Sequence, residues 1–164
     1  MFSAKLLAQA ECLLEDCKAK GVRLATAESC TGGLIIACLT EVPGSSAVVD
    51  RGFVTYDNGA KTELLDVPAH LFSEVGAASE EVSSAMAEGA LRHSSADIAV
   101  SCTGIAGPSG GTEGKPVGTV HLACAARGKP TLHLQRNYGD LGRGEVRART
   151  TEDAFGLIRR QLEA

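Results

Sequence analysis

Apolar residues recur at helical spacing near the start of the chain and again near its end. Within the first twenty residues, every third or fourth position is apolar, which is the pattern of a helix that buries one face. Ser3 can cap this helix and Gly21 can end it, because a serine oxygen accepts from free N–H groups and glycine tolerates left-handed backbone. The same periodicity predicts helices over 79–93, where Ser79 precedes two acidic residues, and over 145–162.

Apolar runs between these helices predict β-strands and shorter helices. The candidate strands are residues 22–26, 47–56, 98–102, 119–125 and 131–138. The last two flank the Gly-Lys-Pro triplet at 128–130 and therefore predict a hairpin. Residues 34–39 predict a helix that ends before Pro43, and short helical pieces are expected as far as Leu71.

This order of elements predicts one three-layer α/β domain over residues 1–164, with helices on both faces of a sheet. Because a hairpin closes the run of strands, we expect the sheet to be mixed and mostly parallel. Ligands of such sheets bind beyond the carboxyl ends of the strands. The glycine-rich turns that follow the strands are therefore where a site is expected.

The composition agrees with one globular domain and excludes several classes of function. Of the 164 residues, 44% are hydrophobic and 22% are charged, as in ordinary globular proteins. A net charge of −4 and only 4% aromatic residues argue against nucleic-acid binding. No apolar run is long enough for a membrane span. The six cysteines form no C-x-x-C pair and follow no secretory segment, so we expect reduced thiols in a cytoplasmic protein.

Ser29 is the first candidate for chemistry. It lies in the segment A-E-S-C-T-G-G at 27–33, where a predicted strand passes into a predicted helix. At such a turn the serine hydroxyl can project while N–H groups of the helix start face the same space, as in a nucleophile beside an oxyanion hole. The alternative is that Ser29 or Thr31 only caps the helix.

A serine nucleophile needs a base, and Lys61 is the best candidate. None of the four histidines lies in a turn or beside a carboxylate motif, so the usual histidine base is not indicated. Lys61 closes the segment Y-D-N-G-A-K that begins at Tyr56. A partly desolvated lysine loses its proton more readily than one in water. The alternative is a solvated lysine at the start of a helix.

A glycine-rich loop and two arginines are candidates for binding a substrate. The segment from Gly104 to Gly107 can present several N–H groups to an anion or a carbonyl oxygen, or can be only a tight connection. It lacks the spacing of a dinucleotide fingerprint, and G-G-T-E-G-K-P lacks the hydroxyl residue of a P-loop. Arg143 and Arg147 are four residues apart, so they can share one helix face and hold a phosphate, or form a solvated cationic stripe.

Seven segments in order resemble one family along nearly the whole chain. They are A-E-S-C-T-G-G at 27–33, P-G-S-S at 43–46, R-G-F-V-T-Y-D-N-G-A-K at 51–61, G-A-A-S-E at 76–80, T-G-I-A-G-P at 103–108, K-P-V-G-T-V at 115–120 and R-G-E-V-R at 143–147. The family is the C-terminal domain of the competence/damage-inducible CinA proteins, the nicotinamide-nucleotide amidases. One departure is that Leu-Gly precedes Arg143, where the family usually has G-D-R.

The resemblance implies a bacterial enzyme that hydrolyses nicotinamide mononucleotide to nicotinic acid mononucleotide and ammonia with a serine and a lysine. Ser29 and Lys61 match these two roles, and Tyr56 is expected to orient the lysine or stack on the pyridine ring. Members often carry a further N-terminal domain, for which this chain has no room, so a stand-alone amidase is expected. The residues expected around the substrate are Cys30, Thr31, Gly32, Gly33, Thr103, Gly104, Ile105, Ala106, Gly107, Arg143 and Arg147.

Two other hypotheses stay open at this level. One is a non-catalytic module that binds or senses a nucleotide, and the other is an amidase with Cys30 as the nucleophile, since a thiol near a helix start can be acidified. We expect a small nucleotide as partner, and neither a cofactor nor a metal, because no ligand cluster has the required spacing. Nucleic acid and membranes are not expected partners. Whether the protein is a homo-oligomer is not decided by any surface signal in the sequence.

Overall fold

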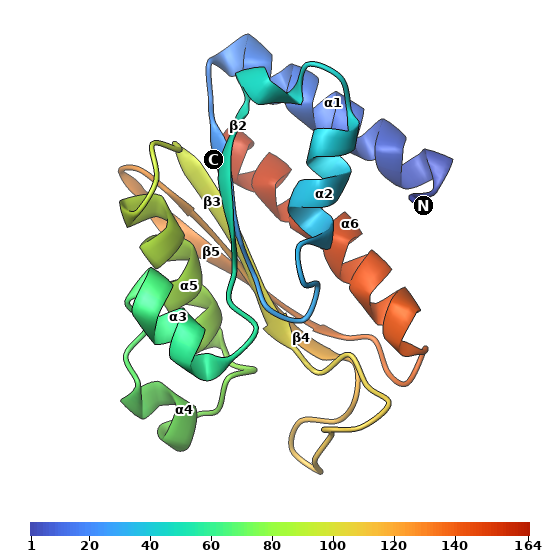
Figure 1. Ribbon diagram of the computed structural model, residues 1–164, viewed down its shortest axis with the longest axis vertical. Coiled ribbons are helices and arrows are strands. Elements are labelled where there is room, and N and C mark those ends of the chain that lie inside the picture. The colour runs from blue at the N-terminus through green and yellow to red at the C-terminus, as the bar shows by residue number, and fades with distance from the viewer.

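The computed structural model describes residues 1–164 as one α/β unit (Figure 1). The strands are β1 (Leu24–Glu28), β2 (Val49–Val54), β3 (Ile98–Gly104), β4 (Thr119–Ala126) and β5 (Lys129–Asn137). The helices are α1 (Ala4–Lys20), α2 (Leu34–Glu41), α3 (Asn58–Leu65), α4 (His70–Glu74), α5 (Glu80–Arg92) and α6 (Arg143–Glu163), with a short 3-10 turn at Ser45–Ala47.

The five strands form one sheet in the order β2-β1-β3-β4-β5. β1 pairs in parallel with both β2 and β3, whereas β4 is antiparallel to β3 and to β5. Four of the five strands therefore point the same way, and only β4 runs against them. This confirms the prediction of a mixed, mostly parallel sheet that ends in a hairpin.

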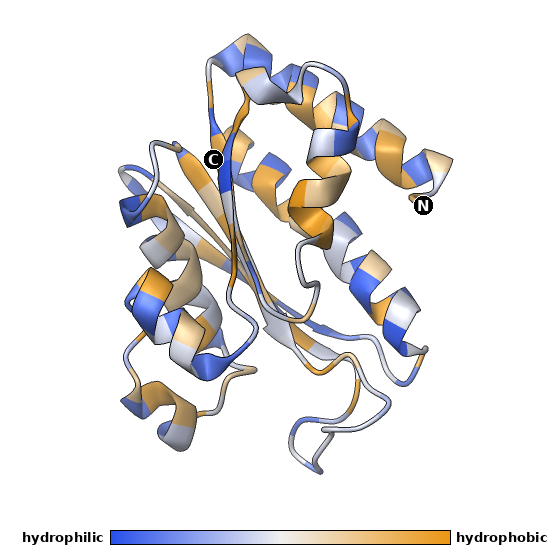
Figure 2. Cartoon of the chain, viewed as in Figure 1, coloured by the Kyte–Doolittle hydropathy of each residue, from blue (hydrophilic) through white to orange (hydrophobic).

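Helices cover both faces of the sheet, which makes the three predicted layers. Figure 1 shows α1, α2 and α6 on one face and α3, α4 and α5 on the other. A cluster of 25 buried apolar residues lies under the first group, and one of nine residues lies under the second. In Figure 2 hydrophobic and hydrophilic residues alternate along the helices, and hydrophobic stretches also occur on the strands. Burial of these two faces is the main driving force for the fold.

Caps confirm both predicted ends of α1 and the predicted start of α5, whereas α6 begins at Arg143, two residues earlier than predicted, without a side-chain cap. The Ser3 hydroxyl accepts from the N–H of Leu6 at 3.1 Å, and Gly21 ends α1 with φ 66°. The Ser79 hydroxyl accepts in the same way from the N–H of Val82 at 3.2 Å at the start of α5. Local sequence is sufficient for these ends because capping uses only neighbouring residues.

Several predicted strand ends were wrong by two or three residues. β1 extends to Glu28 instead of ending at Thr26, because Glu28 pairs with β3 and its charge is compensated inside the fold. β2 covers only Val49–Val54, so that Tyr56 lies beyond the strand. β5 begins at Lys129 rather than at residue 131.

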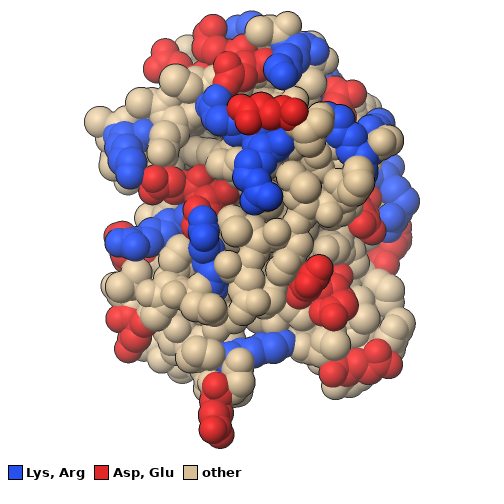
Figure 3. Space-filling view, turned by 180° about the vertical axis from the view of Figure 1, so that it is seen from behind, with Lys and Arg blue, Asp and Glu red and all other residues tan.

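The helices do not include a segment with both the length and the apolar character that a bilayer crossing requires. On the face shown in Figure 3, acidic and basic side chains are intermingled around a broad uncharged area.

We predict that Gly89→Ala destabilises the packing of α5. A Cβ at Gly89 would lie 2.0 Å from the carbonyl oxygen of Leu65 at the end of α3, and backbone cannot yield as a side chain can. The expected loss in the free energy of unfolding is about 1–3 kcal/mol, measured by urea denaturation. In the control Gly156→Ala on α6, a Cβ meets no atom within 4 Å, and the variant should gain about 0.5–1 kcal/mol. Equal stability of the two variants would contradict the close α3–α5 contact.

Candidate active site

A loop of residues 29–33, here called the Ser29 loop, connects β1 to α2. The N–H of Ser29 donates to the carbonyl of Cys102 on β3 at 3.1 Å, and the N–H of Gly32 donates back to the carbonyl of Ser29 at 3.0 Å. Gly32 and Gly33 have φ of 59° and 105°, which other residues rarely adopt. The loop is therefore a tight turn anchored to the neighbouring strand.

The carboxylate of Glu28 holds this turn from the inside of the protein. It is fully buried and accepts four hydrogen bonds, from the Thr31 hydroxyl at 2.6 Å, the N–H groups of Ile35 and Ile36 at 2.8 and 3.0 Å, and the Thr26 hydroxyl at 3.2 Å. Two of these donors are the free N–H groups at the start of α2, where negative charge is favoured. Glu28 is therefore the cap of α2.

This role of Glu28 was missed in the sequence, because Glu28 lies six residues before the start of α2 and reaches its N–H groups only through the fold of the intervening loop. It also argues against the interpretation that Ser29 only caps the helix. Since Glu28 caps the helix, the Ser29 hydroxyl is not needed for capping, and it makes no hydrogen bond within the chain.

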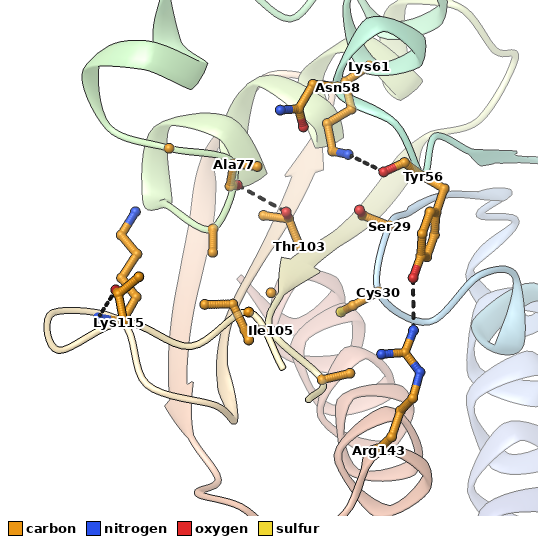
Figure 4. Close-up of a pocket in the computed structure, with 16 residues that line it drawn as sticks. Ser29, Cys30, Tyr56, Asn58, Lys61, Ala77, Thr103, Ile105, Lys115 and Arg143 are labelled. Atoms are coloured by element: carbon orange, nitrogen blue, oxygen red, sulfur yellow. Dashed lines mark hydrogen bonds between the residues drawn. The ribbon is translucent and has the colours of Figure 1, made fainter. Parts of the chain in front are cut away.

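A cavity of about 430 Å³ lies at the carboxyl ends of β1, β2 and β3 (Figure 4). This is the edge at which the sequence predicted a site. Its lining comes from the loops that follow the three strands, from the turn before α5 and from the start of α6. The lining residues are Ser29, Cys30, Tyr56, Asn58, Lys61, Gly76, Ala77, Ala78, Thr103, Gly104, Ile105, Ala106, Gly110, Thr112, Lys115 and Arg143.

Ser29 and Lys61 line this cavity together. Ser29 is 9% exposed and Lys61 only 1% exposed, so the lysine is not the solvated residue of the alternative interpretation. The Lys61 Nζ donates to the carbonyls of Thr55 at 2.8 Å and Tyr56 at 3.2 Å. In Figure 4 the lysine side chain extends from α3 toward the same end of the cavity as the Ser29 hydroxyl. Two of the three ammonium donors are thus occupied by carbonyls, and the third direction stays free.

Burial lowers the pKa of Lys61 below that of an ordinary lysine, although the charge of nearby Asp57 acts in the opposite direction. Desolvation disfavours the ammonium form, because the carbonyl dipoles replace only part of its hydration. A larger fraction of Lys61 is therefore neutral near physiological pH than for a lysine in water. A neutral amine is the form that can accept a proton.

Cys30 lines the same cavity, but its environment does not favour a thiolate. A hydrogen bond with the thiol of Cys102 and burial both raise the pKa of Cys30 well above its ordinary value. The thiolate is the nucleophilic form of cysteine. This argues against the hypothesis that Cys30 is the nucleophile.

Two lining residues, Cys30 and Gly104, have backbone N–H groups without a partner in the chain. On β3, Cys102 accepts from the Ser29 loop while the N–H of Ile105 donates toward β4. Because backbone groups of alternate residues in a strand point to the same neighbour, the N–H of Gly104 points past the end of β1 toward the cavity. Cys30 and Gly104 thus offer the two donors that an oxyanion hole needs.

The two arginines of α6 do not converge on the cavity as expected. Arg143 lines the cavity, where its Nη1 donates to the carbonyl of Gly107 and its Nη2 to the hydroxyl of Tyr56, both at 2.8 Å. Arg147 does not line the cavity and instead contacts backbone carbonyls of the loop. A spacing of four residues places the two Cα atoms on one face of the helix but does not decide where long side chains end.

Most of the predicted binding residues meet at the cavity. Cys30, Thr103, Gly104, Ile105, Ala106 and Arg143 line it, whereas Thr31, Gly32, Gly33, Gly107 and Arg147 do not. Sequence analysis missed Lys115, which lines the cavity and whose Nζ donates to the carbonyl of Val75, the residue before the lining residue Gly76. Its position in the segment K-P-V-G-T-V was the available signal. No group of three or more His, Cys, Asp or Glu side chains is arranged to hold a metal ion.

Fold and cavity together define a small α/β domain whose ligand site is built from loops at the ends of parallel strands. Residues 7–162 match the family model of the CinA C-terminal domain, and the chain belongs to this family. Among curated relatives, a CinA-like protein of Mycobacterium sp. (strain JLS) is 54% identical over 145 residues, which are 87% of this chain and 34% of that protein. The chain spans about a third of the length of the curated relatives it matches.

Solved structures agree with this membership. A competence/damage inducible protein, CihA, from Agrobacterium tumefaciens is 47% identical, with a TM-score of 0.97 and coverage of 100% of this chain and 99% of that one. A CinA superfamily protein from Escherichia coli is 29% identical, with a TM-score of 0.89 and coverage of 96% and 92%.

We predict that Glu28→Gln destabilises the domain, because all four partners of the carboxylate are donors and a carboxamide NH₂ would face at least one of them. The expected loss is about 1–3 kcal/mol in the free energy of unfolding, measured by urea denaturation. Glu41→Gln is the matched control, since Glu41 is exposed in the last turn of the same helix, and it should change stability by less than about 0.5 kcal/mol. Equal effects in the two variants would show that Glu28 does not cap α2.

Proposed function

We propose that this protein is an amide hydrolase that converts nicotinamide mononucleotide to nicotinic acid mononucleotide and ammonia. The observation that carries the proposal is a serine hydroxyl with no hydrogen bond within the chain in the same cavity as a buried lysine of lowered pKa. Groups with shifted pKa values in a cleft are typical of catalytic sites. Membership of the CinA C-terminal domain family is compatible with this activity.

The reaction proceeds in two halves. Neutral Lys61 takes the proton of the Ser29 hydroxyl while the Ser29 Oγ attacks the carboxamide carbon. The oxyanion that forms is stabilised by the N–H groups of Cys30 and Gly104. The tetrahedral intermediate then collapses, its C–N bond breaks, and protonated Lys61 gives its proton to the departing nitrogen, which leaves as ammonia.

The second half hydrolyses the acyl-enzyme. Lys61 is again neutral and takes a proton from a water molecule, whose oxygen attacks the ester carbon. The bond to the Ser29 Oγ breaks, and Lys61 returns its proton to the serine, which releases the nicotinate product. No cofactor enters either half of the reaction.

The remaining lining residues suit a small cationic ring that carries a ribose phosphate. Tyr56 is 61% exposed at the cavity mouth, where its ring can stack on the pyridinium. Arg143 and Lys115 bring two positive charges to the cavity, and a guanidinium is well suited to a phosphate. The volume of about 430 Å³ lies within the usual range for small-molecule sites. The partner is therefore a single nucleotide rather than nucleic acid.

We predict that Ser29→Ala and Lys61→Ala each lower ammonia release from nicotinamide mononucleotide by at least about 10³-fold, because neither group can replace the other. The measurement is a coupled ammonia assay on proteins whose folding has been checked by circular dichroism. Ser73→Ala and Lys18→Ala replace exposed residues and should keep full activity.

Two outcomes would contradict the assignment. Full activity of either Ser29→Ala or Lys61→Ala would remove that residue from the mechanism. Ligand binding by the wild-type protein without any turnover would favour a nucleotide-sensing module. Cys30→Ser should keep most of the activity if Ser29 is the nucleophile.

The lowered pKa of Lys61 predicts how the rate depends on pH. Since the neutral amine is the reactive form, kcat should be low at acidic pH and rise as Lys61 loses its proton, with the midpoint below the pKa of an ordinary lysine. A pH–rate profile of the wild-type protein measures this midpoint. Lys61→Arg cannot supply a neutral base and should lack the rising limb. A midpoint at or above the ordinary lysine pKa would contradict the role of burial.

A further inference from the structure

Arg147 contacts the Ser29 loop without lining the cavity. Its Nε donates to the carbonyl of Cys30 at 3.1 Å and its Nη2 to the carbonyl of Thr31 at 2.9 Å. The guanidinium thus spans two successive peptide groups of the loop. Arg147 belongs to α6, whose neighbouring residues Val146 and Thr150 are fully buried. The contact therefore joins the loop to a rigid element.

These two hydrogen bonds also orient the N–H groups of the loop. In a trans peptide the C=O and N–H bonds point in opposite directions. With the carbonyls of Cys30 and Thr31 turned toward Arg147, the N–H groups of Thr31 and Gly32 point away from it. The N–H of Gly32 indeed donates to the carbonyl of Ser29 on that side. Rotation of either peptide plane would break a charge-assisted hydrogen bond.

Three anchors then hold the short loop that contains the nucleophile. Ser29 is held to β3 by its N–H, and the Thr31 hydroxyl is held to Glu28. Arg147 binds the carbonyls of Cys30 and Thr31. The loop backbone lies against the guanidinium, because a Cβ at Gly32 would lie 3.4 Å from the Arg147 Nη2. The free N–H of Cys30 lies inside this held segment.

We propose that Arg147 is a positioning residue that fixes the backbone of the Ser29 loop, so that the N–H of Cys30 stays in place to bind the oxyanion, and that it is not a ligand of the substrate phosphate. The inference rests on the proposed amidase function. It assigns the two arginines of α6 to different tasks: Arg143 contacts the substrate in the cavity, and Arg147 acts through the backbone of the loop.

A comparison of kinetic constants separates the two roles. Arg147→Ala should lower kcat by about 10²-fold, the effect of losing one oxyanion donor, with little change in KM. The decrease should be the same for nicotinamide mononucleotide and for its nucleoside without the phosphate. Arg143→Ala should instead raise KM, and only for the phosphorylated substrate. Arg149→Ala, which replaces an exposed residue on the same helix, should behave as wild type.

Rescue provides a readout that a general loss of folding would not give. Millimolar guanidinium should restore part of the kcat of Arg147→Ala, because the ion can occupy the vacated site beside the two carbonyls, and it should not restore Arg143→Ala or Ser29→Ala. A rise in KM confined to the phosphorylated substrate, with kcat unchanged, would overturn the proposal and make Arg147 a phosphate ligand. Unchanged kcat and KM would overturn it as well.

Hydrogen–deuterium exchange tests the same idea without any assay of activity. In Arg147→Ala, amides of residues 29–34 should exchange faster than in the wild-type protein, while amides of β3 and α5 should be unaffected. Arg149→Ala should show the wild-type pattern. If the wild-type protein releases no ammonia, the proposed function fails, but faster exchange in this segment would still support the positioning role. If the amides of residues 29–34 exchange equally fast in Arg147→Ala and in the wild-type protein, the positioning role is wrong.

Discussion

Four hydrogen bonds converge on the buried carboxylate of Glu28, and the geometry of the cavity depends on them. The residue ends β1 and at the same time caps α2, so the strand and the helix cannot move independently. Ser29 is the next residue and takes its position from this arrangement. A buried carboxylate is tolerated here because every group that contacts it is a donor. A rigid scaffold positions side chains more accurately than a free loop, and Ser29 directly follows the residue that joins β1 to α2.

The burial of Lys61 follows from the order of the strands. The parallel order of β2, β1 and β3 brings the ends of the three strands to one edge of the sheet, so that segments around residues 29, 58 and 104 meet although they are far apart in the chain. Lys61 enters this crowded edge from the first turns of α3 and has only carbonyl oxygens to replace water. Burying an amine in this way costs stability, and such costs are typical of functional sites.

α6 contributes both to the cavity and to the larger apolar cluster, which lies under α1, α2 and α6. Its first turns supply Arg143 to the cavity and Arg147 to the back of the Ser29 loop, and the rest of the helix packs against the sheet. Helical periodicity predicted correctly that the two arginines share a helix. It did not predict that Arg143 lines the cavity while Arg147 binds the Ser29 loop, because that requires the relative placement of α6 and β1.

Local sequence determined the helices with strong caps, the hairpin and the strand-to-helix turn that carries Ser29. These features depend on hydrophobic periodicity, on capping side chains and on glycine conformation, which act between residues close in the chain. Only the tertiary structure decided that Glu28 is buried in the strand, that Lys61 is desolvated, and that Arg147 binds the loop while Lys115 lines the cavity. Burial, pKa and the end point of a long side chain depend on neighbours that are distant in sequence, and these become known only when the strands and helices are assembled.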